Sequence, residues 1–386
     1  MTKSLLVYSY SAKNAGDMAI TIGALDYLTS KYDECISISR YSKNQVSYMS
    51  STNFINKRYD NVKNFPNPFH LDRSRGSFNI IKDYFNGLVK LIFKGDNLFY
   101  DLVNDVDAVY FNGGNLLRCN KIADFIRLIA LLKPLKIALK ANKKVIILPN
   151  STAEINLIGK LLLSSVLNKV DVLYAREKLS FKKFKNDFPN CNVKLSTDIA
   201  FAIKSEILHE KREKIIAFTT RSQTMGDIAE LDNKIKKKIQ GSLHNCVKHC
   251  LDQGFEVKLI IQTKKDVKFT KDLYSEFSDN KKVSIHESYD VIDLINVYSS
   301  CSLLIGMRLH SIILAMSTGT PVIGFFKKEW GLKNPGLLKA YNQNFVFIDN
   351  NENDLIEAVK PYDFKIIESV SEEIIKTKNK FLKKLK

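Results

Sequence analysis

CSLLIGMRLHSIILAMSTGTPVIGFFKK, residues 301–328, contains two short apolar runs separated by apolar residues at helical spacing. The runs at 302–305 and 321–326 have the length of buried strands, and 309–318 has the periodicity of a helix. A strand, a helix and a second strand in this order are typical of a βαβ unit in a parallel sheet. We therefore expect an α/β fold.

The same alternation extends through the rest of the chain. In the first half we expect strands near 4–9, 35–40, 106–111, 144–148 and 171–175, with helices at 17–31, 78–94, 121–140, 154–168 and 177–186. In the second half we expect strands near 214–219, 255–261, 282–286, 302–305 and 321–326, with helices at 231–252, 266–278, 291–299, 309–318 and 353–359. Residues 51–77 are predicted to be irregular and exposed, as in a mobile loop at an active site.

The chain has 386 residues, enough for two domains with separate cores. The charged, weakly patterned segment 202–213 is the predicted linker. We expect one Rossmann-like domain at 1–205, a second at 206–360 and a basic C-terminal helix at 361–386. Two such domains facing each other would leave a cleft lined by the carboxyl ends of the strands, where ligands bind in this fold class.

The charge balance is strongly basic, with 59 Lys and Arg against 41 Asp and Glu and a formal net charge of +18. Such an excess favours an anionic partner, an anionic substrate or an acidic membrane surface, although a biased background composition with a merely solvated basic surface gives the same count. No zinc finger, RNP-type aromatic pattern or basic helix with interleaved aromatics is present, so nucleic-acid binding is not expected.

The six cysteines are scattered without the spacing of a disulfide framework, which favours a reducing compartment. The first residues are predicted to form a strand followed by a polar loop rather than a signal peptide. No run approaches the roughly 18 apolar residues that a spanning helix needs. We expect a cytoplasmic protein.

Arg308 and His310 follow the first apolar run of the opening segment. If the backbone is still extended there, residues two apart point to the same side, at the strand end where ligands bind. A guanidinium fork suits a carboxylate or a phosphate, and an imidazole exchanges a proton near neutral pH. The alternative is that Arg308 pairs with a surface acid while His310 caps the following helix.

Two glycine-containing loops follow predicted strands in the first half. They are NAGDMAI, with Asn14, Gly16 and Asp17, and YFNGGNLL, with Gly113, Gly114 and Asn115. Glycine lets backbone N–H groups approach an anion or a sugar, and a helix N-terminus favours negative charge. Asp17 could instead cap the helix that it opens, and Gly113 and Gly114 could simply make a turn.

Taken in order, these motifs resemble the polysaccharide pyruvyl transferase family. GMRLHSIILAMSTGTPVIGF is similar to the Arg-x-His signature of that family, NAGDMAI to its Asn-x-Gly-Asp loop and YFNGGNLL to its glycine-rich turn. AREKLSFKKF and STDIAF are similar to its Arg-Glu-x-x-Ser helix start and later Asp, here Arg176, Ser180 and Asp198. The resemblance covers nearly the whole chain and implies two Rossmann-like domains in a glycosyltransferase-B-like arrangement.

The resemblance implies a ketal-pyruvate transferase. It would move a pyruvyl (enolpyruvyl) group from phosphoenolpyruvate to a sugar of a cell-surface polysaccharide or its precursor, free or lipid-linked, and form a pyruvate ketal. The first domain would bind the acceptor and the second the donor. No cofactor or metal is implied.

The same resemblance assigns functions to single residues. His310 is the candidate acid that protonates the methylene carbon of the donor, and Asp17 is a candidate base from its position alone. The expected substrate-binding residues are Arg308, Arg176, Lys328, Asn14, Gly16, Gly113, Gly114 and Asn115.

The donor-binding lysine of the family follows the strand that ends in FFKKEWGLK here, usually after a tyrosine that this chain lacks. Lys327, Lys328 and Lys333 are therefore all candidates. Arg221, at the end of an earlier predicted strand, is a further candidate ligand for a phosphate.

Two other patterns have simpler interpretations. HNCVKHC, with His244, Cys246, His249 and Cys250, contains side chains that can bind zinc, but its cysteines lie one turn apart on an amphipathic helix and are predicted to face the core. The tail EEIIKTKNKFLKKLK is either a basic helix lying on anionic lipid at the inner face of a membrane or an ordinary helix packed on one domain.

Two other functions fit the same sequence. A nucleotide-sugar-dependent glycosyltransferase would share the architecture, because fold does not determine chemistry. A non-catalytic membrane or glycan adaptor would use the basic surface alone, and the presence of Arg308 and His310 argues against it.

Overall fold

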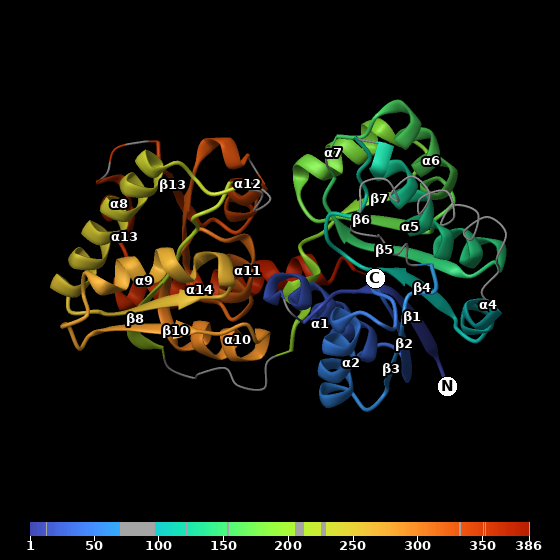
Figure 1. The fold of residues 1–386 in the computed structure, drawn as a ribbon, viewed down its shortest axis with the longest axis horizontal. Coiled ribbons are helices and arrows are strands. Elements are labelled where there is room, and N and C mark those ends of the chain that lie inside the picture. Colours follow the sequence, from blue (N-terminus) through green and yellow to red (C-terminus); the bar gives the residue numbers. More distant parts are fainter. Residues whose placement is uncertain are drawn as a thin grey trace. The chain divides into compact units, whose positions relative to one another are not determined.

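The computed structural model describes residues 1–12, 14–69, 97–120, 122–152, 154–204, 212–224, 229–331, 333–349, 351 and 353–385. The contacts within the folded chain divide it into two compact units, each with its own parallel sheet (Figure 1). The first unit comprises Met1–Lys13, Ile20–Ile203 and Lys384–Lys386, and the second comprises Asn14–Ala19 and Lys204–Lys383.

The sheet of the first unit has the strand order β3-β2-β1-β4-β5-β6-β7. Its strands are β1 (Lys3–Ser9), β2 (Glu34–Ser39), β3 (Val62–Phe65), β4 (Ala108–Phe111), β5 (Lys144–Asn150), β6 (Val172–Ala175) and β7 (Val193–Leu195). The central strands are apolar and buried, as expected for a parallel sheet covered by helices. The order reverses between β1 and β4, which makes their carboxyl ends the switch point of this sheet.

Helices connect these strands. They are α1 (Ala15–Thr29), α2 (Val46–Arg58), α4 (Asn97–Asn104), α5 (Ile122–Lys140), α6 (Leu157–Leu167), α7 (Lys178–Asp187) and the short 3₁₀ helix η1 (Ile199–Ala202). The first turn of α1 falls in the second unit, and the rest of the helix belongs to the first.

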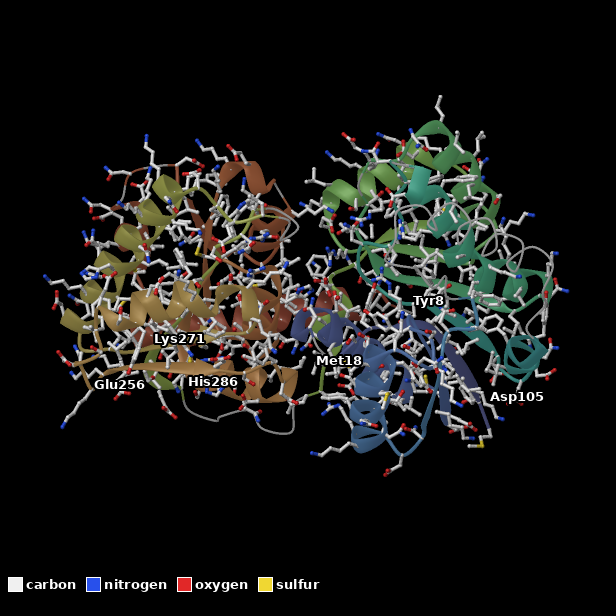
Figure 2. The ribbon with its side chains drawn as sticks, in the orientation of Figure 1. Tyr8, Met18, Asp105, Glu256, Lys271 and His286 are labelled. Carbon is white, nitrogen blue, oxygen red and sulfur yellow. The ribbon has the colours of Figure 1, made fainter. Side chains whose placement is uncertain are left out.

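The two ends of β1 differ in chemistry. At its amino end, the Nζ atom of Lys3 donates a 2.8 Å hydrogen bond to Asp105. Tyr8, which is labelled in Figure 2, lies near the carboxyl end. Its φ is 76°, and the register with β2 shifts between Val7 and Ser9. A positive φ at a bulky residue is strained, and such strain is typical of functional sites.

The sheet of the second unit has the strand order β10-β9-β8-β11-β12-β13. Its strands are β8 (Glu213–Thr219), β9 (Glu256–Ile261), β10 (Val283–Glu287), β11 (Cys301–Gly306), β12 (Val322–Phe326) and β13 (Asn344–Phe347). Its α-helices are α8 (Asn233–Asp252), α9 (Val267–Ser275), α10 (Val291–Ser300), α11 (Leu309–Ser317), α12 (Lys333–Ala340), α13 (Asp354–Val359) and α14 (Phe364–Leu382). The switch point lies between β8 and β11.

The structure confirms the α/β fold and every predicted strand to within a few residues. The prediction of an irregular segment at 51–77 is wrong for its first part, because α2 continues to Arg58 and β3 occupies Val62–Phe65. Residues 70–77, the predicted helix at 78–94 and most of the predicted linker lie outside the described residues. The short elements α4, β7, α12 and β13 were not predicted from the sequence.

The C-terminal helix α14 packs on the second unit. Ile367 and Ile374 on its apolar face are buried, and the Nζ atom of Lys378 donates to the carbonyl of Ser317 at the end of α11, at 2.7 Å. Of the two interpretations of the basic tail, the structure supports the packed helix. Among the residues that the structure describes, no helix combines the length and the apolar character that crossing a bilayer requires.

Arg212 holds three elements of the second unit together. Its Nη1 atom donates to the carbonyls of Ser299 and Cys301 at 3.2 and 3.0 Å and to Oγ1 of Thr320 at 2.6 Å, and its Nη2 atom donates to the carbonyl of Thr318 at 2.9 Å. Burial lowers the pKa of this guanidinium. The carbonyls at the C-terminal ends of α10 and α11 stabilise its charge.

We expect Arg212→Met to destabilise the protein by about 2–4 kcal/mol, because four buried acceptors would lose their donor. The thermal midpoint, measured by scanning fluorimetry, should fall by several degrees. Lys365→Met, which removes an exposed charge from α14, is the matched control and should leave the midpoint nearly unchanged. Equal midpoints for the two variants would contradict this assignment.

Candidate functional site

The switch point of the second sheet is where β11 ends and α11 begins. β11 ends at Gly306, Arg308 is the N-cap residue of α11, and His310 lies in the first helical turn. The Oγ atom of Ser311 donates to the carbonyl of Arg308 at 2.7 Å and closes this turn. The expectation of an extended backbone through residue 310 is therefore wrong, and Arg308 and His310 do not lie on one face of a strand.

Arg308 forms a two-pronged ion pair with Asp266. Its Nε and Nη2 atoms lie 2.7 and 2.8 Å from the two carboxylate oxygens, and both residues are buried. The backbone N–H of Ser222, after β8, donates to the same carboxylate at 3.3 Å. The alternative in which Arg308 pairs with an acid is thus the observed one, except that the acid is buried rather than on the surface.

His310 packs directly against the backbone of Gly16. A Cβ atom built at residue 16 would lie 2.3 Å from Nδ1 of His310, which no real contact permits. The imidazole therefore leaves no room for a side chain at residue 16. The contact brings together the NAGDMAI and Arg-x-His motifs, which lie at opposite ends of the chain.

Asn14 caps the helix that begins beside His310. Its Oδ1 atom accepts hydrogen bonds from the backbone N–H groups of Gly16 and Asp17, at 3.0 and 3.4 Å. Asp17 is not the cap. It lies within the first turn, where its carboxylate accepts a 3.4 Å hydrogen bond from the side chain of Asn14.

The glycine turn after β4 is tied to the protein itself. The N–H of Gly113 donates to Oδ1 of Asn112 at 2.8 Å, and that of Gly114 donates to the carbonyl of Pro149 at 3.2 Å. Gly114 has φ of +124°, and a Cβ there would lie 2.5 Å from the hydroxyl oxygen of Tyr10. These N–H groups already have partners, so the geometry favours the turn over anion binding.

Arg176 also has partners within the protein. Its Nη1 atom donates to Asp198 at 2.8 Å, its Nε atom donates to the hydroxyl of Ser151, and Glu177 lies 3.5 Å away. Burial acts to lower the pKa of Arg176, but the carboxylates of Asp198 and Glu177 outweigh it and raise that pKa above its ordinary value. Glu177 in turn accepts from Ser180, so the Arg-Glu-x-x-Ser motif forms a closed polar network.

Two side-chain amide oxygens near this network lack a hydrogen-bond donor. The Oδ1 atoms of Asn115, after β4, and of Asn150, at the end of β5, are shielded from solvent and accept no hydrogen bond from any described residue. The Nδ2 group of Asn150 is used, because it donates to the carbonyls of Asn112 and Leu148. A shielded acceptor without a donor costs free energy that a bound hydroxyl could recover.

The candidate lysines follow β12. The ammonium of Lys327 pairs with Glu329 at 2.7 Å. The ammonium of Lys328 lies 5.8 Å from the ring centre of Phe347 on the edge strand β13, which is on the opposite side of β12 from β11. Lys328 is thus directed away from the switch point, which the sequence could not show.

Arg221, which follows β8, is held by three local contacts. Its Nε and Nη2 atoms donate to the carbonyls of Gln223 and Thr224, at 3.0 and 2.7 Å. Its guanidinium carbon lies 4.7 Å from the ring centre of Trp330. Sequence reasoning missed Trp330 and Asp266, which are the partners of the two buried arginines beside the switch point.

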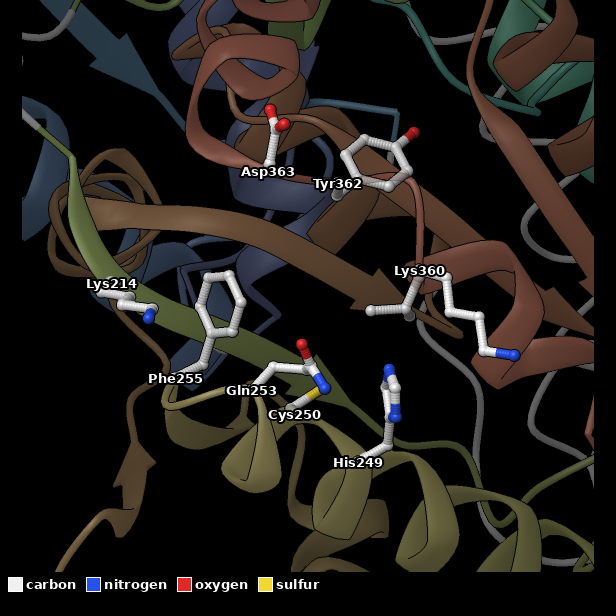
Figure 3. A pocket seen from close by; sticks show the side chains of 9 residues that line it. Lys214, His249, Cys250, Gln253, Phe255, Lys360, Tyr362 and Asp363 are labelled. Carbon is white, nitrogen blue, oxygen red and sulfur yellow. The ribbon is translucent and has the colours of Figure 1, made fainter.

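The histidine and cysteine pairs of α8 are separated in the structure. Cys246 and Cys250 are completely buried, as predicted, whereas the ring of His244 contacts Glu276. His249 lines a cavity of about 490 Å³ (Figure 3). That cavity lies where β8 begins, at the amino ends of the strands, whereas the switch point lies at their carboxyl ends. Within the described ranges, no group of three or more potential metal ligands occurs.

The switch point of the second unit combines features that suit an anion and a proton donor. Helices α1 and α11 both begin there, and the contact between Gly16 and His310 joins their first turns. Helix N-termini carry partial positive charge, which favours phosphate or carboxylate. In α1 the first N–H groups already donate to Asn14, so the first turn of α11 is the better source of hydrogen bonds to an anion. The imidazole between them is a potential proton donor.

Comparison with known proteins places the chain in context. The family model described as polysaccharide pyruvyl transferase matches residues 14–325. None of the curated protein sequences compared with this chain matches it.

Solved structures with the same fold include UDP-GlcNAc 2-epimerases and MurG. UDP-GlcNAc 2-epimerase from Methanocaldococcus jannaschii is 13% identical, with 93% of this chain and 92% of that chain covered and a TM-score of 0.58. The corresponding enzyme from Neisseria meningitidis bound to UDP-GlcNAc is 14% identical, with coverages of 100% and 99% and a TM-score of 0.58. MurG from Acinetobacter baumannii is 11% identical, with coverages of 98% and 95% and a TM-score of 0.52. These likenesses confirm the predicted glycosyltransferase-B-like fold class.

We expect Gly16→Ala to destabilise the protein by about 1–3 kcal/mol, because the new methyl group overlaps the imidazole of His310. In a His310→Ala background the same substitution should cost at least about 1 kcal/mol less, since the two residues are in contact. Chemical denaturation of the four proteins measures this coupling.

Gly241→Ala in α8 is the matched control, because a methyl group there meets nothing within 4 Å. It should stabilise the protein by about 0.5–1 kcal/mol. Additive effects of Gly16→Ala and His310→Ala would show that the two side chains do not share this space.

Proposed function

This chain belongs to the polysaccharide pyruvyl transferase family, and we propose that it transfers a pyruvyl group from phosphoenolpyruvate to a sugar of a cell-surface polysaccharide or its precursor. The product is a pyruvate ketal, and inorganic phosphate is released. The observation that supports this function best is the position of His310 at the joined first turns of α1 and α11. That position offers an acid beside an anion site, which is what this donor requires.

In the proposed reaction His310 transfers a proton to the methylene carbon of phosphoenolpyruvate. The electron pair of the double bond forms the new C–H bond and leaves a cationic centre at the carbon that bears the phosphate. A first sugar hydroxyl attacks that carbon and loses its proton. Phosphate leaves, a second hydroxyl of the same sugar attacks and loses its proton, and the ketal closes. Of the two protons released by the hydroxyls, one restores His310 and the other leaves with the phosphate. The overall change is phosphoenolpyruvate plus a sugar diol giving a ketal plus phosphate.

The donor carries a carboxylate and a phosphate, so it needs several fixed positive groups. We assign these to the N–H groups in the first turn of α11, to the partial positive charge at the N-terminus of α1 and to Lys327, because Asn14 already binds the first N–H groups of α1. In this scheme Arg308 acts mainly through its pair with Asp266, because that pair fixes the segment that precedes His310. Asp17 is the proposed base for the sugar hydroxyl, since it lies one residue after Gly16.

The acceptor saccharide is assigned to the first unit. Asn115 and Asn150 there present shielded amide oxygens without donors, and sugar hydroxyls are hydrogen-bond donors of the right kind. Arg176 is assigned a positioning function, because its contacts hold Ser151 and Asp198 in place. No step of this proposal uses a cofactor.

Calorimetry with phosphoenolpyruvate tests the donor assignment. We expect the unmodified protein to bind it and His310→Gln to bind within about threefold. Phosphate release with a panel of simple glycosides should fall by about 10²–10⁴-fold in that variant, the range for loss of a general acid. His249→Gln is the control, because His249 lies near the amino ends of the strands of the same sheet. This variant should bind phosphoenolpyruvate and release phosphate as the unmodified protein does.

Arg308→Ala needs a separate readout, because it leaves Asp266 buried without its partner and costs about 3–5 kcal/mol of stability. Arg308→Lys keeps the charge and serves as the folded comparison.

Stabilisation against heat by a uridine diphosphate sugar, together with no binding of phosphoenolpyruvate to the unmodified protein, would overturn the proposal in favour of a glycosyltransferase.

A second experiment distinguishes Lys327 from Lys328, two of the three candidate lysines. Lys327→Ala should weaken phosphoenolpyruvate binding by about tenfold, a typical effect of losing a charge-assisted contact. Lys328→Ala should change it less than threefold, because that ammonium lies over Phe347 on the edge strand. The reverse order in calorimetry would move the donor ligand to Lys328.

A further inference from the structure

Helix α6 has an apolar face that points outward. Leu157, Ile158 and Leu161 are 79%, 60% and 75% exposed. They lie at positions i, i+1 and i+4 and therefore on one side of the helix. The opposite side is also apolar, because Leu163 and Val166 are buried in the first unit. A helix on the surface of a water-soluble domain ordinarily presents polar residues outward, so this face is suited to an apolar environment.

Lysines accompany this face. Lys160 on α6 pairs with Asp187 on α7, and Lys183 pairs with the second oxygen of the same carboxylate. The pair between Lys160 and Asp187 places α7 beside α6. The sequence of α7, KLSFKKFKND, contains four lysines and a single acidic residue, Asp187, whose charge is already balanced. Lys178, Lys182 and Lys185 are exposed.

We propose that α6 docks the protein on an anionic lipid surface. In this arrangement Leu157, Ile158 and Leu161 enter the boundary between headgroups and acyl chains, and the lysines of α7 contact the headgroups. Apolar side chains beside a cluster of lysines are the combination that binds such surfaces, because the two contributions add. We call these three residues together with α7 the α6–α7 surface.

Charge favours lipid over a second copy of the chain. A symmetric dimer through α6 would bring two lysine-rich α7 helices together, and like charges in an interface oppose association. An anionic bilayer complements them. The basic tail is a weaker candidate, because the apolar residues Ile367 and Ile374 of α14 are already buried against the second unit.

Co-sedimentation with vesicles tests this inference independently of catalysis. We expect the unmodified protein to bind mixed vesicles of phosphatidylglycerol and phosphatidylcholine, to bind pure phosphatidylcholine vesicles weakly, and to be released by salt. The Leu157→Ser/Leu161→Ser double variant should bind the mixed vesicles about tenfold less or weaker, because two side chains no longer enter the lipid. Both residues are exposed, so the variant should keep its thermal midpoint.

The matched control is Val46→Ser/Met49→Ser, which removes two side chains of similar exposure, 60% and 57%, from α2 of the same unit. It should bind like the unmodified protein. Absence of binding by the unmodified protein, or equal binding by the α6 and α2 variants, would overturn the inference. So would a dimer, seen by analytical ultracentrifugation, that the α6 substitutions dissociate. Loss of vesicle binding in Lys376→Glu/Lys380→Glu, with the α6 variant unaffected, would assign the contact to α14 instead.

Discussion

The imidazole of His310 fills the space that a side chain at residue 16 would need. This contact fixes how the first turn of α1 meets the first turn of α11, and the positions of the surrounding groups follow from it. Asn14 caps α1 and orients its N–H groups, while Ser311 closes the turn that carries His310. A methyl group at residue 16 would force the two helix ends apart. The absence of a side chain is therefore as much a part of the site as the imidazole.

In each unit a buried arginine near a strand end pairs with a carboxylate. Arg176 pairs with Asp198 in the first unit, and Arg308 pairs with Asp266 in the second. A buried guanidinium without such a partner would be costly, so the pairs stabilise the loops that they join. In return the arginines are less available to an anionic substrate. We assign anion binding to helix N-termini and a lysine for this reason.

The fold was largely predictable from the sequence, because buried parallel strands such as LLIG at the end of β11 are apolar on both faces and interrupt helical periodicity. The elements that were missed have weak patterns. β7 is the three residues VKL, and α2 is rich in Ser and Asn, which have low helix propensity. Edge strands such as β13 are half exposed and lack a continuous apolar run.

The candidate site was predictable only in part. The motifs around Gly16 and His310 were visible in the sequence, but their contact was not, because nothing local relates two residues so far apart. The backbone change from strand to helix at Arg308 was also misjudged, since an apolar run such as MRLHSII fits either conformation over a few residues. Nothing in the sequence marked Asp266 as the partner of Arg308, because it is one charged residue in a polar segment. Only the fold brings it to Arg308.

A crystal structure of the protein with phosphoenolpyruvate tests the central claim most directly. We expect the donor to lie at the first turn of α11, beside the N-terminus of α1, with the methylene carbon facing the imidazole of His310 and the pair between Arg308 and Asp266 intact. A donor that contacts the glycine turn after β4 or Arg176 and makes no contact with His310 would contradict this expectation.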